Sequence, residues 1–241
     1  MLRRRSRLTA AAVSGALVAA IALAPTGSAS TSEGAEIPGG PTSSSDAAPV
    51  RLDTAIFLPD QTPAPAVLLA HGFGGSKESL ADQAQQLADR GYVVLTYSAR
   101  GFGRSSGQIS VNSPDFEVAD ASALVDYLGT RADVVQDAPG DPRVGVAGGS
   151  YGGALSLLLG GTDQRVDAIA ADITWNDLES SLFGQSILGN PVALGAFKKL
   201  WTGWFFSVGL LDPVNGVTEC GRFSPEWCAA YIDATAYGRV S

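Results

Sequence analysis

The 241-residue sequence contains one histidine, His71, one methionine and two cysteines. A zinc site needs three or four histidine, cysteine or carboxylate ligands, and one histidine with two cysteines is too few for a site made of imidazole and thiolate groups. We therefore expect no metal. We also expect no cofactor. Positive charge is also scarce, because 16 lysines and arginines stand against 24 acidic residues and give a formal net charge of −8. Nucleic-acid binding depends on basic surface, so the sequence argues against a nucleic-acid partner.

Long apolar runs are missing beyond the first residues. The apolar stretch 8–24 follows four arginines and precedes Pro25 and the small residues 27–29. This order is typical of an export signal cleaved after Ala29, and the stretch is short for a membrane span. We expect residues 1–29 to be a signal peptide that directs secretion by the Sec route, with the twin-arginine route or an uncleaved anchor as alternatives. Removal of residues 1–29 would take away four arginines and no acidic residue, which leaves 12 basic and 24 acidic residues and a net charge of −12.

The next residues divide the chain into a linker, a core and a lid. Segment 30–49 is rich in Ser, Thr, Gly, Pro and Ala without apolar periodicity, which predicts a flexible linker. Over 50–173, apolar strand-like runs alternate with amphipathic helices, which predicts a mainly parallel sheet with helices on both faces. The strands are expected at 50–58, 66–70, 92–97, 143–148 and 166–171. Binding and catalytic sites in such sheets lie at the carboxyl ends of the strands.

The alternation stops after Asp172, and residues 174–241 are predicted to form a helical lid region. Trp201, Trp204, Phe205 and Val208 recur at helical spacing, which favours a buried face or lid. The apolar part, 200–211, is too short to cross a bilayer.

Both cysteines, Cys220 and Cys228, lie in this last region. Export would place them where disulfides persist, so we predict a disulfide between them. The alternative is a metal-binding pair, which would lack further ligands because the one histidine is far away in the sequence.

The motif Gly148-Gly149-Ser150-Tyr151-Gly152 follows directly after the predicted strand 143–148. A nucleophilic serine must stand on a sharp turn between a strand and a helix, where flanking side chains would clash, and this requirement accounts for Gly148 and Gly152. The helix that begins after Ser150 also points its first amides toward developing negative charge. The motif therefore predicts a nucleophile at Ser150; the alternative is a glycine-rich turn with an incidental serine.

The segment His71-Gly72-Phe73-Gly74-Gly75 follows the buried strand 66–70. In a fold with a serine elbow, this loop and the residue after the nucleophile each supply a backbone amide to the oxyanion hole. We assign these amides to Phe73 and Tyr151, and expect His71 to support the loop by hydrogen bonds. Two glycine-rich segments, 72–77 and 101–107, miss the glycine spacing of phosphate-binding loops and are interpreted as loops at the sheet edge.

Three motifs together carry a family resemblance: segments 71–75, 98–107 and 148–153. They resemble those of α/β-hydrolases of the Xaa-Pro dipeptidyl-peptidase and cocaine-esterase type over about residues 50–180, and the segment after Asp172 and the cysteine-bearing tail look like exported actinobacterial members. The resemblance implies the α/β-hydrolase fold, a serine nucleophile at Ser150, and small-molecule or peptide substrates with an ester or amide bond. Some members use a tyrosine hydroxyl in the oxyanion hole, and this chain has Phe73 there, so a backbone amide must serve.

The departure from the family pattern is at the C-terminal end, where the acid and the histidine of the triad should follow the nucleophile. No histidine follows Ser150. Asp172 is placed for the acid, or it caps the next turn. We expect that the chain stops inside the lid, before the last strands, and that this fragment is nearly inactive. The alternatives are a non-catalytic α/β-hydrolase-like binding protein, and an enzyme that uses His71 or a carboxylate as its base.

Overall fold

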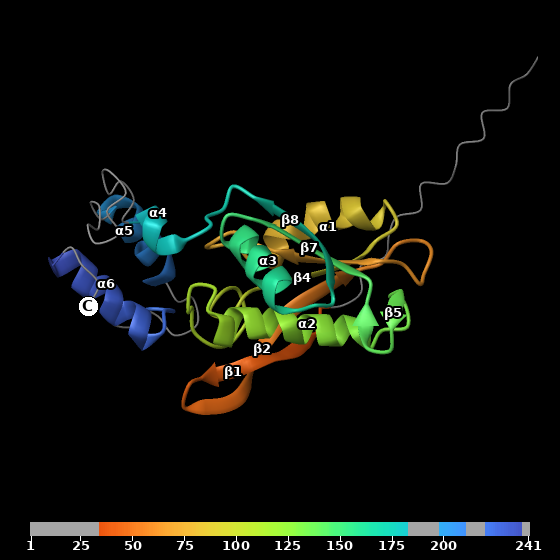
Figure 1. Ribbon diagram of the computed structural model, residues 1–241, viewed down its shortest axis with the longest axis horizontal. Helices are drawn as coiled ribbons and strands as arrows, with labels where there is room; N and C mark the ends of the chain where they lie inside the picture. The colour runs from red at the N-terminus through yellow and green to blue at the C-terminus, as the bar shows by residue number, and fades with distance from the viewer. Residues whose placement is uncertain (1–33, 183–197, 211–219, 238–241) are drawn as a thin grey trace, which may run out of the picture.

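The computed structural model describes residues 34–182, 198–210 and 220–237. A six-stranded sheet in the order β1-β2-β4-β3-β7-β8 forms the centre of the molecule (Figure 1). Its strands are β1 (Glu36–Ser43), β2 (Asp46–Phe57), β3 (Ala66–Ala70), β4 (Val93–Tyr97), β7 (Val144–Gly149) and β8 (Val166–Asp172). The last four in the order are parallel, and β1 and β2 pair antiparallel at one side. The mainly parallel sheet predicted from the sequence is confirmed.

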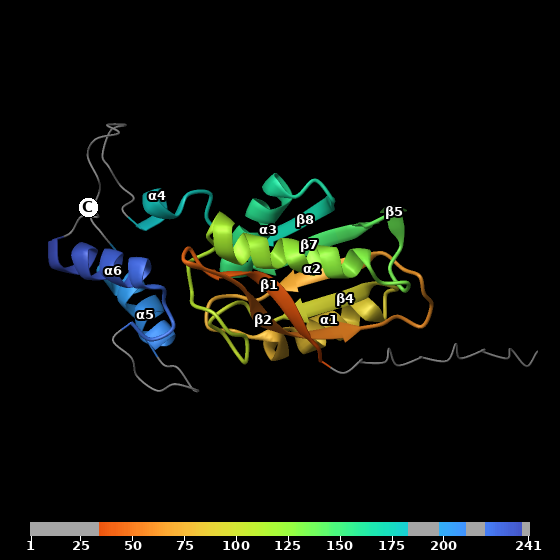
Figure 2. The same cartoon turned by 90° about the horizontal axis from the view of Figure 1, so that it is seen from below.

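Helices cover both faces of this sheet, as predicted. Helix α1 (Ala81–Ala88), which follows the 3₁₀ turn η1 (Lys77–Leu80), lies on one face, and α2 (Ala119–Gly129) and α3 (Tyr151–Thr162) lie on the other (Figure 2). The short hairpin β5 (Gln136–Ala138) and β6 (Asp141–Pro142) connects α2 to β7. Strand β4 is buried along its whole length, because helices pack on both of its faces. The α/β-hydrolase fold follows from this order of elements.

The flexible linker predicted at 30–49 is wrong over the residues that the structure describes. Residues 36–43 form β1 and residues 46–49 begin β2. Strand β1 lies at the sheet edge, where prolines such as Pro38 and Pro41 are tolerated and the register shifts around them. Its glycines allow close packing, since a Cβ on Gly39 would lie 2.5 Å from Oδ1 of Asp120. A Pro- and Gly-rich edge strand lacks apolar alternation, and the composition therefore resembled a tether.

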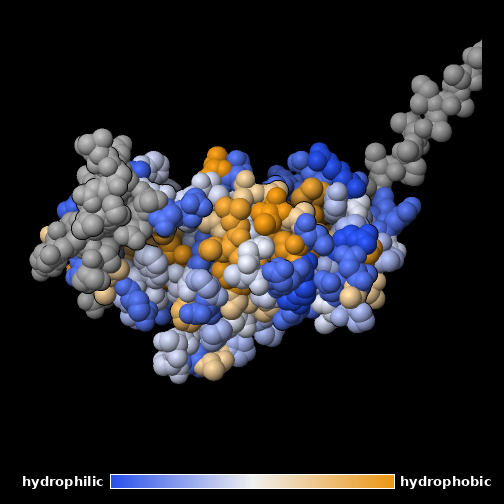
Figure 3. Space-filling model, in the orientation of Figure 1, coloured by the Kyte–Doolittle hydropathy of each residue, from blue (hydrophilic) through white to orange (hydrophobic). Residues whose placement is uncertain are grey.

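At the opposite edge of the described sheet, β8 is exposed along almost its whole length. Figure 3 shows an apolar area over α3 and β8, to which Leu157, Leu158 and Ile169 contribute with exposed fractions of 44%, 37% and 44%. An apolar edge strand of this kind readily pairs with another strand.

The described residues after β8 form three helices, in the region where the sequence predicted a helical lid: α4 (Leu178–Leu182), α5 (Lys199–Leu210) and α6 (Pro225–Tyr237). They lie together at one end of the sheet, beside the core (Figure 2). The predicted stripe is not a buried face: Trp201 and Trp204 are 59% and 53% exposed, and Phe205 and Val208 are half-buried. The buried aromatic of this helix is Phe206, outside the stripe, whose ring stacks on that of Phe223 with centroids 4.2 Å apart. The rest of the predicted lid, at 183–197, 211–219 and 238–241, lies outside the described residues.

The predicted signal peptide also lies outside the described residues. Across residues 34–182, 198–210 and 220–237, every helix is too short or too polar to cross a bilayer.

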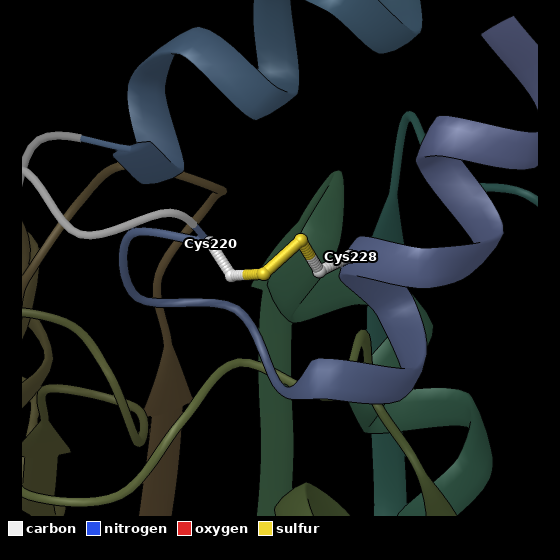
Figure 4. Close-up of a disulfide and its surroundings, with 2 residues drawn as sticks. All are labelled: Cys220 and Cys228. Atoms are coloured by element: carbon white, nitrogen blue, oxygen red, sulfur yellow. A yellow bond between two sulfur atoms is a disulfide. The ribbon is translucent and has the colours of Figure 1, made fainter. Parts of the chain in front are cut away.

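The predicted disulfide between Cys220 and Cys228 is confirmed, with Cα atoms 5.5 Å apart (Figure 4). It joins the start of α6 to the turn before it. The enclosed residues hold this end of the chain on the core, because Ile109 N–H donates to Arg222 O and Ser224 N–H donates to Ile109 O, at 2.7 and 2.9 Å. The disulfide thus stabilises the contact between the lid region and the core.

Replacing Cys228 with Ser is expected to lower the free energy of unfolding by about 2.5 kcal/mol, the loop-closure entropy of so short a loop. Urea unfolding of the oxidised protein and of the variant measures the difference. Reduction of the wild type with dithiothreitol should reproduce the variant's midpoint. Equal midpoints for the oxidised wild type and the variant would show that the disulfide contributes nothing.

Candidate active site

Ser150 lies on the turn between β7 and α3, with φ 53° and ψ −115°. This positive φ is uncommon for a residue with a side chain and costs on the order of 1–3 kcal/mol, so the surrounding structure must hold it. The end of β8 does so from two sides. Ser150 N–H donates to Asp172 O at 2.9 Å, and Ser150 O accepts from Oγ1 of Thr174 at 2.7 Å. The serine therefore stands on a strained turn whose backbone is fixed by hydrogen bonds.

The two glycines that flank Ser150 allow the turn to pack against β3. A Cβ on Gly152 would lie 2.1 Å from Ala70 O, and one on Gly148 would lie 2.6 Å from the same atom. Real Cβ atoms do not approach backbone oxygens so closely, because the steric repulsion is too large. Both glycines are thus required by the close approach of the turn to the end of β3, as the motif suggested.

The amides assigned to the oxyanion hole come from two adjacent strand ends. Tyr151 is the first residue of α3, so its N–H is one of those that have no partner within the helix. Within the described part of the chain, no hydrogen-bond acceptor lies against the N–H of either Tyr151 or Phe73. The rings of the two residues meet edge to face, with centroids 5.4 Å apart. Two uncommitted amides beside a serine on a strained turn match what a developing oxyanion would require.

His71 is 2% exposed and uses both ring nitrogens inside the protein. Its Nε2 accepts from Ala99 N–H at 2.9 Å, so the ring proton is on Nδ1, which donates to Gly72 O at 2.7 Å. Burial lowers the pKa of His71, and the nearby Arg222 lowers it further, which favours the neutral ring. The ring joins the loop after β3 to the loop after β4, which is the supporting role expected from the sequence. Neither nitrogen is left to take a proton from Ser150.

Asp172 ends β8 beside Gly149 and contributes its carbonyl to the Ser150 turn, while its side chain is exposed. Helix α5 packs on the loop 71–75 that follows β3. Phe205 meets Phe73 edge to face, with ring centroids 5.2 Å apart, and a Cβ on Gly74 would lie 2.9 Å from Cγ1 of Val208.

Within residues 34–182, 198–210 and 220–237, no three His, Cys, Asp or Glu side chains gather as a metal site would require.

Sequence reasoning missed two residues beside the site, Asn112 and Glu117. Both are nearly fully buried, and both contact Tyr151, the residue after Ser150. Burial raises the pKa of Glu117 to about 7, although the N–H of Ser110, which donates to the carboxylate, lowers it. Ser113 and Pro114 are a sequence signal for the start of a helix, but such a signal does not indicate that the following turn carries a buried acid toward the site.

Comparison with known proteins identifies the family. Residues 46–206 match the X-Pro dipeptidyl-peptidase (S15 family) model, and the chain belongs to this family. Protein PA2218 of Pseudomonas aeruginosa is 32% identical over 114 residues, which are 46% of this chain and 29% of that protein. Its crystal structure matches with a TM-score of 0.54 and 25% identity over 67% of this chain and 48% of that one.

A further relative is the quorum-quenching protein AidA of Acinetobacter baumannii, 27% identical over 154 residues, or 61% of this chain and 46% of that protein. The chain thus spans less than half the length of these relatives.

Proposed function

We propose that the protein is a serine hydrolase that cleaves ester or amide bonds in small molecules or peptides, with Ser150 as the nucleophile. The observation that carries the proposal is the strained turn at Ser150, with φ 53°, beside two uncommitted amides. Membership of the X-Pro dipeptidyl-peptidase family supports an acyl-transfer reaction. The absence of a hydroxyl at Phe73 leaves the backbone amides as the oxyanion donors.

In the proposed reaction, Ser150 Oγ attacks the carbonyl carbon while its proton passes to a general base. The carbonyl oxygen becomes an oxyanion that accepts from the N–H groups of Phe73 and Tyr151, each worth about 3 kcal/mol in the transition state. The base then gives the proton to the leaving alcohol or amine, and an acyl-serine remains. Water, activated by the same base, hydrolyses this ester and restores the serine hydroxyl.

We infer that the base is an imidazole supplied from outside this 241-residue sequence. His71 is the sole histidine in it, and both of its nitrogens are engaged. Removal of the histidine from a triad costs about a millionfold in turnover, so these residues alone should be nearly inactive. The span of less than half of the relatives' length is consistent with this inference.

We further propose that the protein acts outside the cell, with residues 1–29 as a cleaved signal. The arginines followed by an apolar stretch support export, and so does the disulfide between Cys220 and Cys228, because disulfides persist in oxidising compartments.

Replacing Ser150 with Ala is expected to lower kcat for p-nitrophenyl butyrate at least 10⁵-fold in the full-length protein, because the acyl-enzyme can no longer form. The matched control is Ser156→Ala, the same change at a serine inside α3, where the buried Oγ only donates to Gly152 O. The control should turn over within a few-fold of wild type. Equal turnover of Ser150→Ala and wild type would contradict the proposal.

A second candidate function rests on the missing base. Both ring nitrogens of His71 are engaged within the protein, so it does not serve Ser150 as a base, which also suits a protein that binds ligands without turning them over. This alternative predicts that the full-length protein binds ester analogues but hydrolyses none of the substrates offered.

A further inference from the structure

The loop 109–113 contains two consecutive strained residues next to the candidate site. Val111 and Asn112 have φ values of 56° and 59°. This region is rarely adopted by side-chain-bearing residues, and for a β-branched valine it is a genuine outlier. The loop is held in place from both ends. Ile109 pairs with Phe223, and the Glu117 carboxylate accepts from the N–H groups of Ser110 and Ser113.

The strained turn brings Asn112 against Tyr151. Nδ2 of Asn112 donates to Tyr151 O at 2.9 Å, and the Asn112 N–H donates to the Tyr151 hydroxyl at 3.3 Å. That hydroxyl in turn donates to Oε1 of Glu117 at 3.3 Å. The main chain and the side chain of Tyr151 are therefore held by the same loop, and all three residues are buried.

Two features of this arrangement lower the stability of the folded protein. Oδ1 of Asn112 is buried and lies without a partner among the described residues, and an unpaired buried oxygen destabilises the folded state. The two positive φ values add strain. Costs of this kind, gathered on one loop, are typical of a functional site that must hold its geometry.

We propose that Asn112 is a positioning residue for the oxyanion hole, which fixes Tyr151 so that its amide stays aimed at the developing oxyanion. The inference rests on the proposed function. The peptide plane that carries the Tyr151 N–H is fixed at Ser150 O, which accepts from Thr174 Oγ1 and from Ala154 N–H. Asn112 acts on the next plane, through Tyr151 O. The two planes share the Tyr151 Cα, so loss of the Asn112 donor widens the range of orientations that the Tyr151 amide can take. Glu117 completes the arrangement by holding both the loop and the Tyr151 hydroxyl.

The test is Asn112→Gly in the full-length protein. Glycine adopts φ 59° without strain and keeps the N–H, so the variant loses the side-chain donor while its backbone is relaxed. We expect kcat for p-nitrophenyl butyrate to fall about 20-fold with KM nearly unchanged, because the oxyanion forms only after substrate binding. The inhibition constant of an alkyl trifluoromethyl ketone, which forms a tetrahedral adduct with the serine, should rise by the same factor.

Val111→Gly is the matched control, since it relieves the same kind of strain one residue earlier and leaves the contacts with Tyr151 in place. It should keep the wild-type kcat. Tyr151→Phe is a second variant, which removes both hydroxyl contacts and keeps the ring against Phe73; we expect a fall in kcat of about fivefold with KM unchanged.

Three outcomes would overturn the inference. If wild type has Ser150-dependent turnover but Asn112→Gly and Tyr151→Phe keep its kcat, the positioning role is wrong and the proposed function stands. If Val111→Gly loses as much kcat as Asn112→Gly, the effect belongs to the loop as a whole, and the specific role of Asn112 is wrong. If wild type shows no Ser150-dependent turnover, the proposed function and this inference fail together.

Discussion

Gly152→Ala is expected to lower the free energy of unfolding by about 4 kcal/mol or more, or to prevent folding. The added Cβ would lie 2.1 Å from Ala70 O and 2.9 Å from His71 O, both backbone atoms at the end of β3. Neither a rotamer change nor a small shift relieves a contact with the backbone of a central strand, and mutations with such effects belong to the rare, large class. Urea unfolding followed by circular dichroism measures the loss.

Gly161→Ala is a matched control on the same helix, because a Cβ at Gly161 would meet nothing within 4 Å. Alanine is the better helix former, so this variant should be up to about 1 kcal/mol more stable than wild type. If Gly152→Ala unfolded at the wild-type urea concentration, the close packing of the Ser150 turn on β3 would be wrong.

Arg100→Met is expected to cost about 3–5 kcal/mol of stability. The Arg100 guanidinium is fully buried and donates from Nε and Nη2 to the two carboxylate oxygens of Asp120, both at 2.7 Å, and from Nη1 to Pro41 O at 3.0 Å. Removing one partner of a buried pair leaves the other charge without compensation. Asp120 also accepts from Gly40 N–H at 2.7 Å, so the loss should loosen β1 from the sheet. Urea unfolding and hydrogen exchange of the β1 amides measure both effects.

The control for charge itself is Arg51→Met, because Arg51 pairs with Glu36 at 3.2 Å while both side chains are exposed by more than half. An exposed pair contributes about 0–1 kcal/mol. Combining Arg100→Met with Asp120→Leu should cost less than the sum of the single changes, since an apolar pair leaves no buried charge. A single Arg100→Met variant as stable as Arg51→Met would contradict this account of the buried pair.

The elements that could be predicted from the sequence are those whose apolar pattern lies within a short run of neighbouring residues. Runs such as 66–70 are apolar throughout because both faces of the strand are covered, and this makes buried parallel strands easy to recognise. The first strand escaped recognition because an edge strand needs few apolar residues, and its stability comes from distant partners such as Asp120. Composition alone cannot distinguish such a strand from a tether.

In the candidate site, too, residues defined by their sequence neighbours could be predicted, and residues that act through tertiary contacts could not. Ser150 and its flanking glycines were predicted because the turn places its demands on adjacent residues. The predicted role of His71 depended on its place after a strand, whereas Asn112 and Glu117 act on Tyr151 from 39 and 34 residues away. The positions of Asn112 and Glu117 at the site depend on tertiary contacts and on a backbone conformation that their residue types do not predict. For the same reason, Arg100 entered the sequence analysis only as one residue of the family motif 98–107.

The most direct measurement is mass spectrometry of the full-length protein after reaction with a fluorophosphonate, followed by peptide mapping. The account predicts a single phosphonate adduct on the peptide that contains Ser150, formed at an undiminished rate in Ser156→Ala and absent from Ser150→Ala. An adduct on another residue, or equal labelling of Ser150→Ala, would contradict the assignment of the nucleophile.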